Sequence, residues 1–240
     1  MASVPDLTRS ATLIFSGTVL RIGHSTVPIV PARENLVVVR LDRGLHVDPV
    51  LGDLRGKQIT MAAAVPQSLS PSERAVFFTY SWVHGRGIAV RELEHVDVGG
   101  EENVAAAVAE LPKVHLLERL QRAELVVEAE VVRISTVEKH SRERKVALWA
   151  AAELRVKKVL RGKAQESTMV HFPTADWPPW TNAPRFKEHQ GGVFILHAPN
   201  RNGTLSEATL EVGSLVALDP ADFQAESQLK DVGELLARSE

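Results

Sequence analysis

Short runs of apolar and β-branched residues recur along the whole chain. Glycine and proline clusters separate these runs, which is the pattern expected of strands joined by turns. The pattern predicts strands at 13–22, 36–41, 58–65, 75–82 and 88–98, and again at 125–134, 145–160, 168–172, 192–197 and 209–218. Each half of the chain is therefore predicted to contribute five strands.

The second half of the sequence repeats the first. LIFSGTVLRI at 13–22 returns as LVVEAEVVRI at 125–134, LRGK at 54–57 returns at 160–163, and AVFFTYSW from Ala75 is answered by GVFILHAP from Gly192. Because the order and the rough spacing are kept, we infer an internal duplication. We predict two domains, residues 6–112 and 113–240, each long enough to bury a modest core.

Helical spacing replaces the strand pattern near the end of each half. From Glu101 the apolar residues recur at helical intervals, acidic residues lie at the N-terminal end and Pro112 follows, so a short helix is predicted to close the first half. A second helix is predicted over Val114–Arg122. The C-terminal segment mirrors the first helix, with Asp222 as its cap and Phe223 on its apolar face.

The predicted fold class is mainly β with short helices. Five short strands followed by a helix fit an OB-like barrel, because closure into a barrel removes the exposed edges of such strands. The prediction is two tandem OB-like five-stranded barrels related by duplication, each followed by a helix. An α+β sandwich is the alternative that the same elements allow.

Three sequence features carry a resemblance to a known fold. They are an apolar first strand, a long second strand that ends in an LRGK turn, and a later aromatic strand. In these features the chain resembles the OB-fold, netrin- or tissue-inhibitor-like modules found in many poorly characterised bacterial proteins. The eukaryotic members rely on disulfides, and the protease inhibitors on an N-terminal cysteine that chelates a metal. This chain has no cysteine, so the resemblance implies the fold and not the inhibition.

Composition narrows the classes of partner. A formal charge of -2 provides no general attraction for nucleic acid or for a membrane surface. The absence of cysteine excludes disulfides, thiolate metal sites and cysteine nucleophiles. No apolar run approaches the roughly 18 residues of a membrane span, and MASVPDLTRS does not resemble a signal peptide. We expect a soluble, cytoplasmic protein, or an exported one if a signal peptide has been removed.

A basic loop is predicted between the first two strands of the second repeat. It contains Lys139, Arg142, Arg144 and Lys145. In an OB barrel this loop lies at the ligand face, where cations can follow a phosphate backbone while aromatic rings stack on bases. The alternative is a solvated charged hairpin in which Glu138 and Glu143 compensate the charge, and the chain's overall charge favours this alternative.

The insertion His171–Gly192 has no counterpart in the first repeat and is rich in tryptophan and proline. Prolines stiffen a loop and tryptophans are common anchors of protein interfaces. We therefore take Trp177, Trp180 and Phe186 as candidate partner-binding residues. The equal alternative is that the rings fold back and cover an open end of the barrel.

Signatures of catalysis and of metal binding are missing from the sequence. The nine histidines are scattered, without an HExxH motif or a close His-x-His pair, and no serine lies in a GxSxG context. We expect no cofactor, no metal and no catalytic residue. The sequence favours a non-catalytic protein-binding or scaffold component of a larger assembly. The alternatives are a single-stranded nucleic-acid-binding protein and an enzyme whose site the sequence does not reveal.

Overall fold

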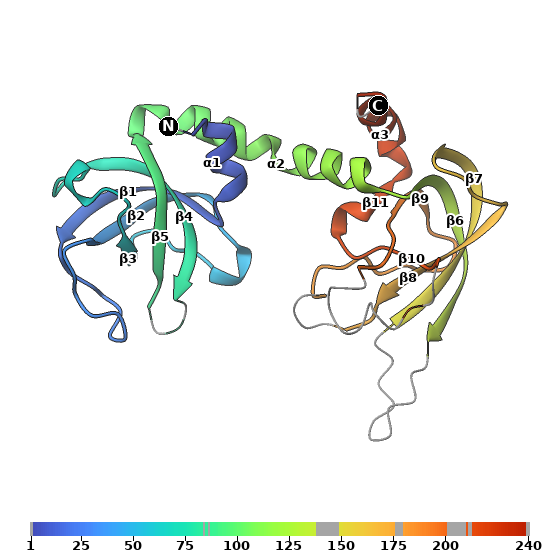
Figure 1. The fold of residues 1–240 in the computed structure, drawn as a ribbon, viewed down its shortest axis with the longest axis horizontal. Coiled ribbons are helices and arrows are strands. Elements are labelled where there is room, and N and C mark those ends of the chain that lie inside the picture. Colours follow the sequence, from blue (N-terminus) through green and yellow to red (C-terminus); the bar gives the residue numbers. More distant parts are fainter. Residues whose placement is uncertain are drawn as a thin grey trace, which may run out of the picture. The chain divides into compact units, whose positions relative to one another are not determined.

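The computed structural model describes residues 2–83, 85, 87–137, 149–175, 180–200, 210 and 213–238. The chain divides into two compact units, Met1–Pro112 and Lys113–Glu240. Both are built mainly from β-strands, as predicted, with a closed five-stranded barrel in the first unit and a half-barrel in the second (Figure 1). In the described ranges, no helix has the length and apolar character needed to cross a membrane.

The first unit begins with a short helix and then forms its barrel. The elements are α1 (Val4–Ser10), β1 (Leu13–Ile22), β2 (Leu36–His46), β3 (Gln58–Ala62), β4 (Arg74–Val83) and β5 (Ala89–Asp97). The strand order is β1-β2-β3-β5-β4, and β5 closes the barrel by running parallel to β3 and antiparallel to β4. The sequence pattern missed α1, a two-turn helix that Ser3 caps by accepting a hydrogen bond from the Asp6 amide.

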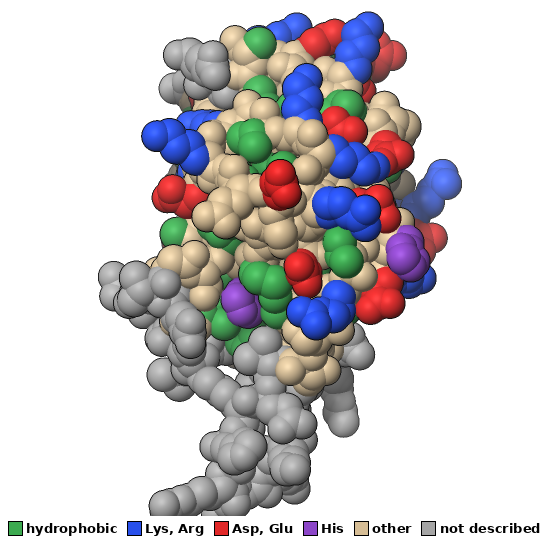
Figure 2. Space-filling model, turned by 90° about the vertical axis from the view of Figure 1, so that its right-hand side faces the viewer, with side chains coloured by type: hydrophobic (Ala, Val, Ile, Leu, Met, Phe, Trp, Pro, Cys, Tyr) green, Lys and Arg blue, Asp and Glu red, His purple; other side chains and the backbone are tan. Residues whose placement is uncertain are grey.

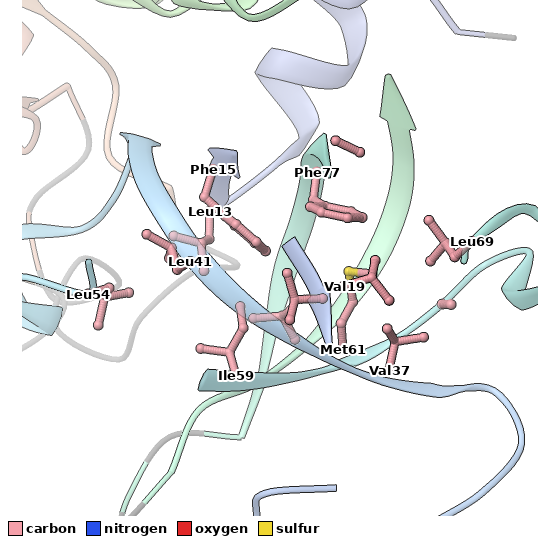
Figure 3. Packing of buried hydrophobic residues seen from close by; sticks show 14 residues of the cluster. Leu13, Phe15, Val19, Val37, Leu41, Leu54, Ile59, Met61, Leu69 and Phe77 are labelled. Atoms are coloured by element: carbon pink, nitrogen blue, oxygen red, sulfur yellow. The ribbon is translucent and has the colours of Figure 1, made fainter. Parts of the chain in front are cut away.

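Alternate residues of the first-unit strands point into the barrel and out of it. Inside, Phe15 and Phe77 lie with ring centroids 5.4 Å apart within a cluster that includes Leu13 and Met61 (Figure 3). Outside, Phe78 belongs to a second buried cluster together with residues of α1 and of the helix that follows β5. The strands therefore bury both faces, which explains why their sequence reads as a continuous apolar run and not as strict alternation.

A single helix, α2 (Glu101–Arg122), replaces the two helices predicted on either side of Pro112. The predicted break was wrong because apolar residues pack on both sides of the proline. Val104 belongs to a buried cluster of the first unit, and Leu120 belongs to one of the second. This burial offsets the roughly 3 kcal/mol that proline costs inside a helix by removing a hydrogen bond and crowding the preceding turn.

The second unit starts with the same arrangement of strands. Its elements are β6 (Leu125–Val137), β7 (Trp149–Arg161), β8 (Ser167–Pro173), β9 (Gly191–Leu196), β10 (Leu215–Val216), β11 (Phe223–Ala225) and α3 (Leu229–Ala237). The order is β10-β8-β7-β6-β9-β11, so β8-β7-β6-β9 repeats β3-β2-β1-β4 of the first unit. Four strands of each unit thus follow the predicted duplication.

Strand irregularities confirm that the two units share a pattern. The pairing of β1 with β2 shifts register at Ile14/Phe15, Ser16/Gly17 and Val19/Arg21, and that of β6 with β7 shifts at Val126/Val127, Glu128/Ala129 and Val131/Arg133. When LIFSGTVLRI is aligned with LVVEAEVVRI, the three shifts fall at the same positions. Such bulges bend a strand, so both first strands curve in the same places.

The fifth strand is where the two units differ. In the first unit one strand, β5, pairs with both of its neighbours. In the second unit two short strands share this role: β10 runs parallel to β8, and β11 runs antiparallel to β9. A short 3₁₀ turn, Pro220–Asp222, separates the two pieces. The single strand predicted at 209–218 is therefore wrong in extent, and part of it lies outside the described residues. Phe223, predicted on the C-terminal helix, lies on β11 and packs against the core of the half-barrel.

Candidate functional site

The tryptophan-rich insertion packs against its own unit in the part that the structure describes. Trp180 is half-buried, and its ring centroid lies 5.9 Å from that of Trp149 on β7. The guanidinium of Arg185 donates hydrogen bonds to the carbonyls of Ala175, Trp180 and Ala183, which fold the loop onto itself. Trp177 lies outside the described residues.

Phe186 belongs to the core and not to a binding surface. Its side chain is buried, and its ring centroid lies 4.9 Å from Phe172, 5.2 Å from Phe194 and 5.8 Å from Phe223. A ring held among three others offers no area to a partner. Trp180 thus packs against a strand of its own unit, and Phe186 is part of the core of that unit.

The four cations of the predicted basic loop, Lys139, Arg142, Arg144 and Lys145, lie outside the described residues. Two neighbouring cations, one on β6 and one on β7, each have an acidic partner. Lys157 Nζ lies 3.1 Å from Glu226 Oε1, and Arg133 lies 3.2 Å from Glu153 Oε2. On the face of the second unit shown in Figure 2, basic and acidic side chains alternate without forming a patch of one sign.

A groove on the first barrel is the candidate site that the structure adds. Its volume is about 310 Å³. It is lined by Arg33 and Asn35 from the β1–β2 connection, Leu36 from β2, Ala62, Ala63 and Ala64 at the end of β3, Tyr80 and Trp82 from β4, and Arg91 and Glu92 from β5. The lining thus combines three small alanines with two large aromatic rings and two arginines.

Strand register brings the aromatic and cationic side chains of this groove together. Tyr80 and Trp82 are two residues apart on β4 and both line the groove, and Arg91 of β5 is the direct partner of Tyr80. The Arg91 Cζ atom lies 5.0 Å from the centre of the Trp82 ring, within the range of a cation–π contact. Tyr80 and Trp82 remain 36% and 38% exposed, so both rings can be reached from solvent.

Glu92 lines the same groove, but both oxygens of its carboxylate form hydrogen bonds within the first unit. The side chain is only 1% exposed. Its Oε2 atom accepts a hydrogen bond of 2.8 Å from the Ala64 amide, and its Oε1 atom lies 2.7 Å from His95 Nδ1. The bond from Ala64 fastens the segment after β3 to β5 and so holds the alanines that line the groove.

A buried ionic network in the second unit is structural. The Asp222 carboxylate is fully buried and accepts hydrogen bonds from Arg119, His197 and the amides of Leu218 and Asp219. Burial by itself would raise the pKa of Asp222, but the hydrogen bonds from His197 and Arg119 outweigh it and hold the pKa below its usual value. Predicted as a helix cap, Asp222 instead fastens α2 to the turn between β10 and β11.

The described ranges contain no group of three or more histidine, cysteine or acidic side chains placed to hold a metal ion. Comparison of the chain with protein-family models and with curated proteins gives no match. The groove on the first barrel is therefore judged by its own geometry. Sequence reasoning had noted the aromatic content of the strand at 75–82, and the spacing of Tyr80 and Trp82 was the available signal for a shared exposed face.

Proposed function

We propose that the chain is a non-catalytic protein-binding component of a larger assembly, and that the groove on the first barrel is its docking site. One observation carries the proposal: Tyr80, Trp82 and Arg91 lie together, solvent-accessible, in a concave part of the surface. Tyrosine, tryptophan and arginine are the residues most enriched at the energetic centres of protein interfaces. A groove that gathers all three is suited to anchoring another protein.

The OB type of barrel is part of the same proposal. It is supported by the five-stranded closed order and by the parallel pairing of β3 with β5. OB barrels bind ligands beside the loops that follow their first and fourth strands. Arg33 lies in the β1–β2 connection and Trp82 near the end of β4, so the groove has the location expected of an OB ligand site.

Single-stranded nucleic acid is the second candidate ligand, favoured by the stacked pair of Arg91 and Trp82. Aromatic and guanidinium planes stack on bases, and this contact is tolerant of sequence. Against it, the chain carries a formal charge of -2, and nucleic-acid binding depends on several cations that neutralise phosphates. Protein is therefore the ligand class that we favour.

If the groove is the docking site, replacing Trp82 should abolish partner binding. The full chain with Trp82→Ala should fail to retain the partner that the unaltered chain recovers from its native source, and binding of the purified partner should be lost in the same way. Because Trp82 is 38% exposed, the free energy of unfolding should fall by only about 1 kcal/mol or less. Val50→Ala is the matched control, since Val50 is 84% exposed on a separate turn and should leave binding unchanged.

One further variant and two nucleic-acid ligands decide between the candidates. If Trp180→Ala abolishes binding in a folded chain while Trp82→Ala does not, the docking site belongs to the insertion and the proposal is wrong. Titration with single-stranded DNA and RNA at two salt concentrations tests the second candidate, because phosphate contacts make affinity fall steeply with salt. Tight, salt-sensitive binding that Trp82→Ala removes would replace protein by nucleic acid as the ligand.

A further inference from the structure

We infer that the groove recognises an extended peptide segment carrying an aspartate or glutamate next to a proline or an aromatic residue. The inference rests on the proposed function and specifies its ligand. Four features of the described residues carry it: two groove arginines without ion pairs, the internal hydrogen bonds of Glu92, the contact of Arg91 with Trp82, and the aromatic side chains of the lining.

The arginines of the groove differ from most others of their unit. Outside the groove, each of four arginines contacts a carboxylate: Arg9 with Asp6, Arg40 and Arg74 with Asp42, and Arg43 with Glu101. Among the residues that the structure describes, Arg33 and Arg91 form no ion pair. The N–H groups of each guanidinium are therefore able to donate hydrogen bonds to a ligand.

The groove supplies no acid of its own to these arginines. Glu92 is the acidic residue of its lining, and both oxygens of that carboxylate already have partners, the Ala64 amide and His95. A buried carboxylate that is fully hydrogen-bonded would lose those bonds by turning toward a ligand cation. The lining therefore combines two arginines with this one carboxylate, and its excess of positive charge favours an acidic ligand over a basic one.

Arg91 is already oriented for such a ligand. Its guanidinium lies over the Trp82 ring, with the Cζ atom 5.0 Å from the ring centre. A guanidinium that contacts an aromatic ring through its face keeps the N–H groups on its edge available, and a carboxylate can accept two parallel hydrogen bonds from them. Because the stack restricts the side chain before binding, less conformational entropy is lost when the carboxylate binds.

The two aromatic residues of the lining, Tyr80 and Trp82, account for the proline or aromatic residue in the inferred motif. Tyr80 and Trp82 line the groove together with the small side chains of Ala62 and Ala64, and both rings are accessible to a flat ring of a ligand. Aromatic-lined grooves recognise extended proline-containing segments because such segments are already ordered. A volume of about 310 Å³ is at the lower end for ligand pockets, which suits one or two side chains of a longer segment.

Peptide selection on the full-length chain tests the inference. A phage-displayed library of random heptapeptides is selected on the unaltered chain and depleted on Trp82→Ala. We expect enrichment of Asp or Glu within two positions of Pro, Phe, Tyr or Trp. The enriched peptide is then synthesised, and its affinity is measured by calorimetry for Arg33→Gln, Arg91→Gln and the control Arg74→Gln.

Loss of one charge-assisted contact should lower the affinity for the peptide about tenfold in each groove variant. Arg74→Gln should bind the peptide as tightly as the unaltered chain does. Enriched peptides without acidic residues, or full affinity in both groove variants, would overturn the inferred motif and leave a protein-binding groove in place. A library that yields no Trp82-dependent peptide, or peptides that bind Trp82→Ala equally well, would overturn the proposed function and the motif together.

Discussion

At the residue scale, Asp222 and Glu92 show how buried carboxylates are stabilised in this protein. Asp222 accepts hydrogen bonds from two side chains, Arg119 and His197, and from two backbone amides. Glu92 uses an amide and a histidine in the same manner. An unpaired buried carboxylate would be costly, so the partners of each acid are part of the fold itself.

The lowered pKa of Asp222 predicts acid sensitivity of the second unit. Hydrogen bonds from His197 and Arg119 outweigh the effect of burial, so the folded-state pKa lies below the unfolded value of 3.8. The stabilisation is complete above the unfolded pKa and is lost as the pH falls through the folded pKa, because the unfolded chain then binds the proton more readily. Urea unfolding between pH 7 and pH 2 should show this loss below about pH 4.

Asp222→Asn gives the corresponding variant. An amide cannot replace the charge that faces Arg119, so the free energy of unfolding at pH 7 should fall by about 3–5 kcal/mol and vary less with pH below pH 4. Asp231→Asn is the control, since Asp231 is exposed on α3. An Asp222→Asn chain with unchanged stability at pH 7 would show that the network contributes little.

At the residue scale, the candidate site was harder to predict than the fold. Tryptophan and proline in the insertion drew the sequence interpretation to Trp177, Trp180 and Phe186, but residue type alone does not distinguish a binding anchor from a ring that covers its own barrel. Phe186 is buried among three other phenylalanine rings. The groove could not be read locally because its lining comes from the β1–β2 connection and from strands that are distant in sequence.

At the scale of elements, the strand positions could be predicted because each strand carries its own apolar pattern. The predicted start of β1 at Leu13 and its end at Ile22 are confirmed, and β4 and β9 lie within one residue of the prediction. The errors fall where tertiary contacts override local signals. Pro112 suggested a helix end, but burial on both sides keeps α2 continuous, and the fifth strand of the second unit is interrupted by a turn that Asp222 organises.

The continuous helix predicts that Pro112→Ala is stabilising. Alanine restores a backbone hydrogen-bond donor and removes the crowding of the preceding turn, worth about 3 kcal/mol inside a helix. The greater freedom of the unfolded chain offsets roughly 1 kcal/mol of this, so a gain of about 2 kcal/mol is expected. Urea unfolding measures the gain, and slower hydrogen exchange in α2 should accompany it. A variant no more stable than the unaltered chain would contradict a continuous helix at this residue.

At the scale of the whole molecule, the two units keep one framework and differ in their surfaces. The first closes its barrel with a single fifth strand and presents a groove with exposed aromatic rings. The second divides that strand, holds the turn between its pieces with Asp222, and packs part of its insertion onto the sheet. Duplication followed by change at loops and strand ends allows one copy to bind a partner while the other serves a different purpose.

Hydrogen exchange of the full chain, with and without the partner that it recovers, tests the central claim most directly. Docking in the groove predicts slower exchange at the end of β3 and along β4 and β5, with Trp82→Ala abolishing the effect. Residues 180–190 of the insertion should exchange as before. Slower exchange confined to that insertion, with β4 and β5 unchanged, would contradict the groove as the docking site.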